Sequence, residues 1–286
     1  MRNRGYTHRE QVGPAGTGRT VLAHLLSRRG TAPEAEWRAR IASGAVQVDG
    51  APADAGLVLR AGQWLTWARP PWDEPEVPLC TAVLFRDEHL LAVAKPRGLP
   101  TLPGGGVFQD STLLAVVRRL DPDAAPVHRL GRDTSGVVLF ARTALARNAM
   151  HVALRDRRVR KVYRALCAGH PAQDAFPVDA PIGEVPYAPT GTLHAATPDG
   201  RPSRSRVRVL ERRDGPAPVS LVEVEIETGR PHQIRIHLAF AGHPLVGDPL
   251  FGPGGLPIAG GRAVPGDPGY LLHAHRIAFA HPATGA

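Results

Sequence analysis

Thirteen histidines are present, and some of them have spacings that invite a metal site. His232 and His237 are five residues apart, which does not place both on one helix face. His273 and His275 could share one face of a strand, but no carboxylate or cysteine completes a ligand set with them. We therefore expect no metal.

Three further segments contain residue types used in catalysis. Gly104-Gly105-Gly106 lacks the lysine and the spacing of a phosphate-binding loop, so a turn is the better interpretation. Ser135 is not part of a G-x-S-x-G sequence, which leaves hydrolase chemistry unsupported. Asp133 is the only acid in the nine-residue segment 128–136. Its carboxylate is therefore the one candidate in that segment for acid–base or nucleophilic work.

The charge balance predicts a polyanionic partner. Lys and Arg number 35 and Asp and Glu 26, which gives a net charge of +9. Lys95 and Lys161 are the only lysines, and the planar guanidinium of the many arginines suits phosphate and stacks on bases. A genome biased toward arginine codons explains part of this skew but not the excess of positive charge. Two stretches are either solvated faces or phosphate contacts: Arg155, Arg157, Arg158, Arg160, Lys161 and Arg164, and Arg201, Arg204, Arg206 and Arg208.

Composition places the chain among soluble globular proteins. The apolar fraction is 43% and the charged fraction 21%. No run of about 18 apolar residues is present, so we expect no membrane-spanning helix. No apolar stretch follows the basic residues at the N-terminus, so a cytoplasmic protein is expected. Cys80 and Cys167 make neither a disulfide framework nor a zinc set.

Two domains are expected. All four tryptophans lie in roughly the first quarter of the chain, which predicts a small domain over residues 1–70. Within it, a helix is predicted after Pro33 with Trp37 and Ile41 on one face, followed by a hairpin at Asp49-Gly50. Four prolines between residues 70 and 78 indicate a linker over 71–78, and a larger domain follows over 79–286.

The sequence predicts an α+β fold for the larger domain. Buried strands are predicted over 137–140 and 163–168, and Val222, Val224 and Ile226 alternate as in a third strand. Helices are predicted over 144–157 and 232–240. Strands in succession with separate helices favour an α+β fold over a doubly wound sheet.

Several ordered segments resemble the signature blocks of the RluA family of RNA pseudouridine synthases. They span residues 87–100, 127–143, 161–166, 229–252 and 271–274. The N-terminal part resembles the RNA-binding domain type first named for ribosomal small-subunit protein four, on Arg38, Arg40, Ile41, Gly44, Val46, Val48, Asp49 and Gly50. The resemblance implies a mixed, largely antiparallel central sheet. It also implies an enzyme that isomerises uridine to pseudouridine in ribosomal or transfer RNA without a cofactor. We expect the protein to be a monomer.

The resemblance also assigns site residues. Tyr163 matches a tyrosine that packs on the target base, and Arg235 matches an arginine that pairs with the catalytic carboxylate. Arg129 matches an arginine that occupies the gap left by the flipped base. Substrate contacts are further expected from His128, His232 and Leu238.

One departure from the family pattern puts the activity in question. Gly131 stands where the family has its catalytic aspartate. Asp133 lies two residues later, about 6.6 Å further along if the backbone is extended. Either the loop is re-registered so that Asp133 serves as the catalytic carboxylate, or the chain is a non-catalytic RNA-binding protein on the same fold. The discriminating feature is whether a carboxylate reaches Arg235.

Overall fold

The computed structural model describes residues 1–28, 32–104 and 106–286, and it divides the chain into two compact units. Unit 1 comprises Met1–Glu76 with Gly104–Asp110, and unit 2 comprises Val77–Pro103 with Ser111–Ala286. The boundary falls inside the segment expected to be a linker. The inclusion of Gly104–Asp110 in unit 1 was not expected from the sequence, and Gly105 of the glycine run lies outside the described residues.

A buried carboxylate explains why part of the proline-rich segment belongs to unit 1. Glu74 is only 4% exposed. It accepts hydrogen bonds from the Asn3 side chain at 2.8 Å and from the amides of Gln109 at 2.8 Å and Asp110 at 2.9 Å. A buried carboxylate is stable only when such donors surround it, so Glu74 joins three distant parts of the chain.

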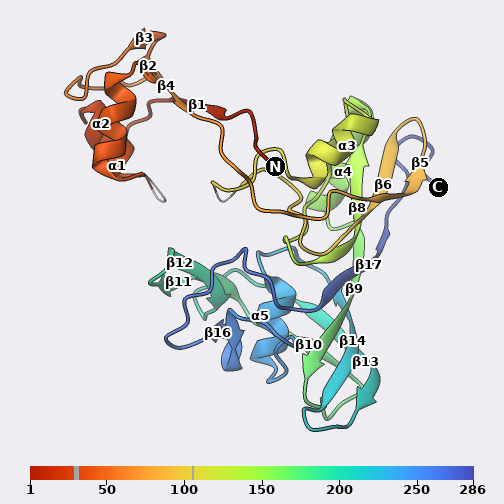
Figure 1. Cartoon of the computed structure of the whole chain (residues 1–286). Helices are drawn as coiled ribbons and strands as arrows, with labels where there is room; N and C mark the ends of the chain where they lie inside the picture. Colours follow the sequence, from red (N-terminus) through yellow and green to blue (C-terminus); the bar gives the residue numbers. More distant parts are fainter. Residues whose placement is uncertain (29–31, 105) are drawn as a thin grey trace. The chain divides into compact units, whose positions relative to one another are not determined.

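Unit 1 has two helices beside a small antiparallel sheet (Figure 1). The sheet has the strand order β1-β4-β2-β3. Trp37 and Ile41 are buried in α2, and Asp49 and Gly50 have positive φ in the hairpin turn, so the predicted helix and hairpin are confirmed. The elements are β1 (Tyr6–Gln11), α1 (Val21–Leu26), α2 (Glu34–Ala42), β2 (Val46–Val48), β3 (Ala51–Pro52) and β4 (Trp64–Arg69).

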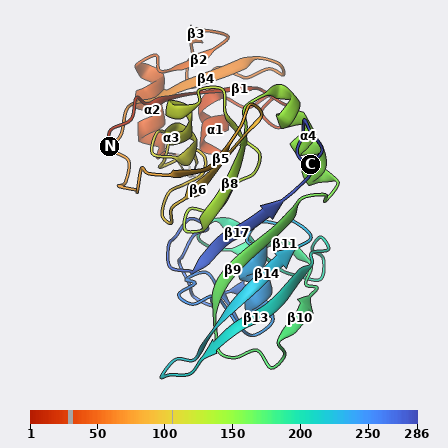
Figure 2. The same cartoon turned by 90° about the vertical axis from the view of Figure 1, so that its right-hand side faces the viewer.

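Unit 2 is built on a large mixed sheet in the order β10-β13-β14-β9-β17-β8-β6-β5, with β7 paired to β8. Every pairing is antiparallel except that of β17 with β8, and Figure 2 shows β9, β14 and β13 side by side. The expected α+β fold with a mixed, largely antiparallel sheet is confirmed. The strands are β5 (Ala82–Arg86), β6 (Leu90–Lys95), β7 (Ala125–Pro126), β8 (Ser135–Ala141), β9 (Arg160–Ala168), β10 (Ala175–Val178), β13 (Ser205–Arg213), β14 (Val219–Ile226) and β17 (Leu272–Ala278).

The helices of unit 2 are α3 (Leu113–Leu120), α4 (Ala144–Arg155) and α5 (Gln233–Phe240). Helix α4 stops two residues earlier than predicted, because Arg157 adopts a left-handed conformation with φ of 58°. Helix α5 is buried from Gln233 to Ala239. It contacts several short elements: β12 (Gly191–Ala196), which pairs with β11 (Ile182–Tyr187), β15 (Phe251–Gly252), the 3-10 helix η1 (Pro253–Gly255) and β16 (Leu256–Pro257). None of the described helices is long and apolar enough to cross a bilayer.

Candidate active site

A cavity of about 350 Å³ lies in unit 2 between the start of α5 and the strands β9 and β17. Its lining combines the segment before β8 with residues far away in sequence: Arg129, Leu130, Gly131, Thr134, Tyr163, Ile226, Gly229–Arg235, Tyr270 and Leu272. Tyr163 sits mid-sheet, opposite Val224 of β14 and Ala274 of β17. The sheet therefore brings the predicted residues Arg129, Tyr163, His232 and Arg235 to one cavity.

The carboxylate that reaches Arg235 belongs to Asp248. The Arg235 Nε and Nη2 atoms donate to the two oxygens of Asp248, each at 2.7 Å. The side chains are only 2% and 1% exposed. Asp248 also accepts from the amides of Leu250 at 2.9 Å and Phe251 at 3.2 Å. The guanidinium carbon lies 5.0 Å from the Phe251 ring centre and 4.1 Å from that of Tyr270, so Arg235 is held rigidly.

The alternative in which Asp133 supplies the carboxylate that pairs with Arg235 is wrong. Asp133 accepts from Arg97 at 2.6 Å and from the amide of Gly269 at 2.7 Å. With Arg97 it lines a separate cavity of about 230 Å³. Burial alone would raise the pKa of Asp133, but these two hydrogen bonds and the charge of Arg97 outweigh it, and the pKa lies below the usual value. Asp133 is thus a stably ionised group outside the cavity around Tyr163.

The backbone of this loop explains the error. The predicted separation of Gly131 and Asp133 applies to an extended chain, whereas the Thr134 amide donates to the Gly131 carbonyl at 3.1 Å and closes a turn. Lys95 fixes that turn, because its buried ammonium donates to the Arg132 carbonyl at 2.8 Å and also to the carbonyls of Pro96 and Leu99. Burial lowers the pKa of Lys95 to about 7.

Gly136 follows the turn and is required by the close approach of two strands. Its φ is +112°, and a Cβ atom there would lie 2.2 Å from the carbonyl oxygen of Ala274. Ala274 is its partner in the parallel pairing of β8 and β17. The glycine therefore lets β17 lie against the signature segment, which brings Tyr270 to the cavity.

Gly131 is a different case, because it does not have a positive φ. A Cβ atom on Gly131 would lie 2.7 Å from the hydroxyl oxygen of Tyr270 and 3.4 Å from Oγ1 of Thr134. The backbone would accept another residue, but Tyr270 already occupies the space. Tyr270 was not among the site residues predicted from the sequence, because no spacing pattern links it to Gly131.

Two expected substrate contacts are not placed at the cavity. Leu238 is fully buried in the core of unit 2. His128 has a structural contact instead, since its Nε2 accepts a hydrogen bond from the amide of Leu139 at 3.2 Å. Burial, together with the charge of Lys161, lowers the pKa of His128 to about 4, which keeps the ring neutral. His232 does line the cavity, and its pKa is about 4 because of burial and the neighbouring Arg235.

The two arginine-rich stretches are largely paired with acids. Arg160 pairs with Glu225, Arg204 with Asp179, Arg206 with Glu227 and Arg208 with Glu223. At the cavity the situation differs. Within the described part of the chain, Arg129 has no ion pair, and the buried Nε of Arg230 has no hydrogen-bond acceptor. These two arginines are the better candidates for contacts to an RNA backbone.

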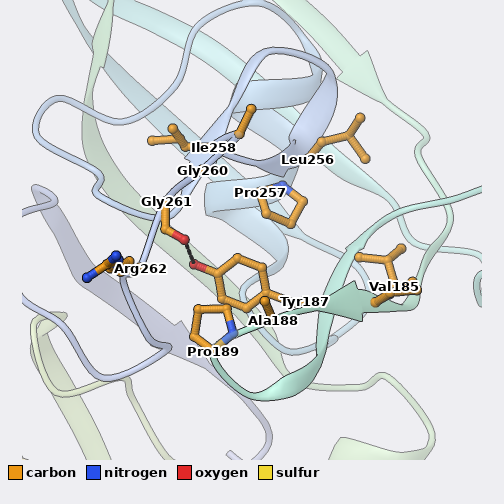
Figure 3. A pocket seen from close by; sticks show the side chains of 12 residues that line it. Val185, Tyr187, Ala188, Pro189, Leu256, Pro257, Ile258, Gly260, Gly261 and Arg262 are labelled. Carbon is orange, nitrogen blue, oxygen red and sulfur yellow. Dashed lines mark hydrogen bonds between the residues drawn. The ribbon is translucent and has the colours of Figure 1, made fainter.

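A larger cavity of about 820 Å³ lies beside Tyr187 at the end of β11 (Figure 3). Its lining is mostly apolar, including Val185, Leu256 and Pro257. The Tyr187 hydroxyl donates to the carbonyls of Gly261 at 3.3 Å and Ala263 at 2.7 Å. Arg262 is the only charged residue in that lining. The smaller cavity, with its arginines and tyrosines, therefore has the better groups for chemistry on a nucleotide.

The chain is similar to known RNA pseudouridine synthases. The RNA pseudouridylate synthase family matches residues 89–240. An uncharacterized RNA pseudouridine synthase of Synechocystis is 46% identical over 247 residues, covering 86% of this chain and 84% of the relative. Ribosomal large subunit pseudouridine synthase D of Nitrosomonas europaea is 38% identical over 208 residues, covering 71% and 59%. The solved structure of human RNA pseudouridylate synthase domain containing 1 has a TM-score of 0.58 at 26% identity, covering 72% and 80%. The chain therefore belongs to the RNA pseudouridine synthases of the RluA family.

Proposed function

We propose that the cavity around Tyr163 and Arg235 receives a flipped uridine of ribosomal RNA and isomerises it to pseudouridine. One observation supports this proposal above all: the fold brings four residues of the signature segments to one cavity, Arg129, Gly131, Tyr163 and Arg235. The cavity volume of about 350 Å³ is within the usual range of small-ligand pockets. The ribosomal large-subunit relative supports ribosomal RNA as the substrate class.

The reaction breaks the N1–C1′ bond, turns the uracil and rejoins it through C5. Taking the base out of its stack costs a few kcal/mol, and contacts in the pocket must offset that cost. In this proposal Tyr163 packs against the uracil. Arg129 is exposed on the rim, where its guanidinium can enter the gap left by the base, and Arg230 contacts the backbone beside it.

The test uses the full chain and RNA labelled with tritium at uridine C5, since the isomerisation releases that hydrogen. Ribosomal and transfer RNA are offered separately. Release from ribosomal RNA at a defined uridine is the expected result. Tight RNA binding with no release from either RNA would contradict catalysis and favour a binding protein on the same fold. Release from transfer RNA alone would contradict the substrate class only.

Tyr163→Leu should reduce the rate of tritium release from bound RNA by about 100-fold. The side chain loses its flat ring, and displacing a reacting base by about 1 Å has a cost of that order. RNA affinity should change little, because the phosphate contacts remain. Tyr187→Leu is the matched control, since Tyr187 is also 9% exposed but lines the other cavity. Loss of RNA binding with intact turnover of bound RNA would contradict the role of Tyr163.

Unit 1 offers a surface suited to RNA. The Arg9 guanidinium lies 4.1 Å from the Trp64 ring centre, and within the described chain it has no ion pair. Arg9→Gln should weaken RNA binding and reduce the slope of log affinity against log salt by about 0.7–0.9, the contribution of one phosphate contact. Arg206→Gln is the control, because Arg206 is already paired with Glu227. Equal slopes for both variants would contradict phosphate binding by Arg9.

A further inference from the structure

The hydroxyl of Tyr270 lies where the side chain of residue 131 would be. A Cβ atom on Gly131 would approach the Tyr270 oxygen to 2.7 Å, and both residues line the cavity with Tyr163. No aspartate or glutamate is among the residues that line this cavity in the described structure. The position left without a carboxylate is therefore filled by a phenol oxygen.

The surroundings of Tyr270 are suited to proton transfer. The Arg235 guanidinium carbon lies 4.1 Å from the Tyr270 ring centre, and the Thr134 hydroxyl lies 3.2 Å from the phenol oxygen. Asp248 fixes Arg235 with two hydrogen bonds, so the cation does not need to reorganise when charge develops on the phenol. Tyr270 is only 3% exposed, which keeps these interactions strong.

The ground state of Tyr270 is the neutral phenol. Burial raises the pKa of Tyr270 above its usual value, although the hydrogen bond with Thr134 and the charge of Arg235 act in the opposite direction. At neutral pH the hydroxyl therefore carries a proton that it can give away. Tyr163 also lines the cavity, but burial raises its pKa to about 12, and among the described residues no cation lies over its ring to offset that effect.

We propose that the Tyr270 hydroxyl is the catalytic acid and base of this enzyme, in the place of the carboxylate that Gly131 cannot supply. This inference rests on the proposed function, since it names a catalyst for the same cavity. It predicts chemistry without a carboxylate at residue 131 and without a role for Asp133, which lines a different cavity.

The proton balance of the reaction fits one phenol. Isomerisation places a hydrogen on N1 and removes one from C5. When the N1–C1′ bond breaks, both electrons go to uracil, and Tyr270 gives its proton to N1, leaving a phenolate near the sugar cation. After the base turns, the C5–C6 electron pair forms the C5–C1′ bond. The phenolate then takes the C5 proton, which restores both the aromatic base and the neutral phenol. No further reactant is needed.

The experiment compares Tyr270→Phe with Tyr187→Phe in the full chain. Each change removes one hydroxyl and keeps the aromatic ring. RNA binding and the contact between Arg235 and the ring of residue 270 should therefore persist. Tritium release from C5-labelled ribosomal RNA is measured in single turnover, with RNA affinity measured in parallel. We expect Tyr270→Phe to slow release by about 100-fold or more, the usual contribution of a general acid or base. Tyr187→Phe should stay within a few-fold of wild type, because Tyr187 lines the other cavity.

Three outcomes overturn the proposal. They are release by Tyr270→Phe at nearly the wild-type rate, an equal loss of release in Tyr187→Phe, and loss in Tyr270→Phe that follows only from weaker RNA binding. Absence of release from the wild-type protein is separate, because it contradicts the proposed function itself.

A second variant keeps the proposal testable if Tyr270→Phe is poorly folded. It carries 3-fluorotyrosine at position 270, which retains the ring and the hydroxyl but has a more acidic phenol. Because the neutral phenol is the active form, the rate should fall at high pH as its proton is lost. That fall should move to lower pH in the fluorinated protein. An unmoved pH profile would contradict a role for the Tyr270 proton.

Discussion

Asp248→Asn is expected to lower the free energy of unfolding by about 3–5 kcal/mol, the usual cost of removing one partner of a buried ion pair. Arg235 and Asp248 are 2% and 1% exposed, so water cannot replace the lost charge. An asparagine would present an amide donor to one of the two guanidinium nitrogens, leaving a buried donor without an acceptor. Tritium release should also fall, because Arg235 would no longer be fixed above Tyr270.

Urea denaturation monitored by circular dichroism measures the stability change. Asp179→Asn serves as the control, because Asp179 pairs with Arg204 on the surface, where both side chains are about half exposed. Solvent screens such a pair, and the midpoint should hardly move. A midpoint for Asp248→Asn close to that of the wild type would show that the pair does not stabilise the fold.

Gly131→Asp combined with Tyr270→Phe is expected to restore tritium release that Tyr270→Phe alone has lost. The single change Gly131→Asp should not support tritium release, because its Cβ would lie 2.7 Å from the Tyr270 hydroxyl. Crowding of this kind typically costs about 1–3 kcal/mol. Phenylalanine at 270 removes the oxygen and opens the space. The backbone at residue 131 accepts a side chain, since its φ is not positive.

The restored rate should come from the carboxylate and not from the altered packing. Gly131→Ala with Tyr270→Phe is the matched control, because it adds the same Cβ without an acid. It should remain as slow as Tyr270→Phe. Recovery of release in this control would show that shape, and not an ionisable group, limits the reaction. If neither double variant recovers tritium release, the result would contradict the idea that a carboxylate at residue 131 can replace the hydroxyl at residue 270.

Local patterns in the sequence were sufficient for much of the fold and for part of the site. Trp37 and Ile41 at helical spacing and the Asp49-Gly50 turn predicted elements of unit 1 correctly, because helix faces and tight turns depend on neighbouring residues. The ordered signature segments identified Tyr163 and Arg235, which the structure places at one cavity. Their contacts with RNA remain predictions.

Which side chains meet depended on the tertiary structure. Asp133 was expected at the site because it is near Gly131 in sequence, yet the turn that Lys95 fixes directs it to Arg97. Asp248 reaches Arg235 from a later loop instead.

Tyr270 shows the same limit most clearly. It lies 139 residues from Gly131, counted as 270 minus 131, and only the pairing of β17 with β8 brings its hydroxyl to that glycine. Sequence by itself determined the family, the elements and the residues that local blocks contain. The identity of the group beside Gly131 was decided by strand pairing over a long separation, because such contacts depend on the packing of the whole sheet and leave no periodic pattern in the chain.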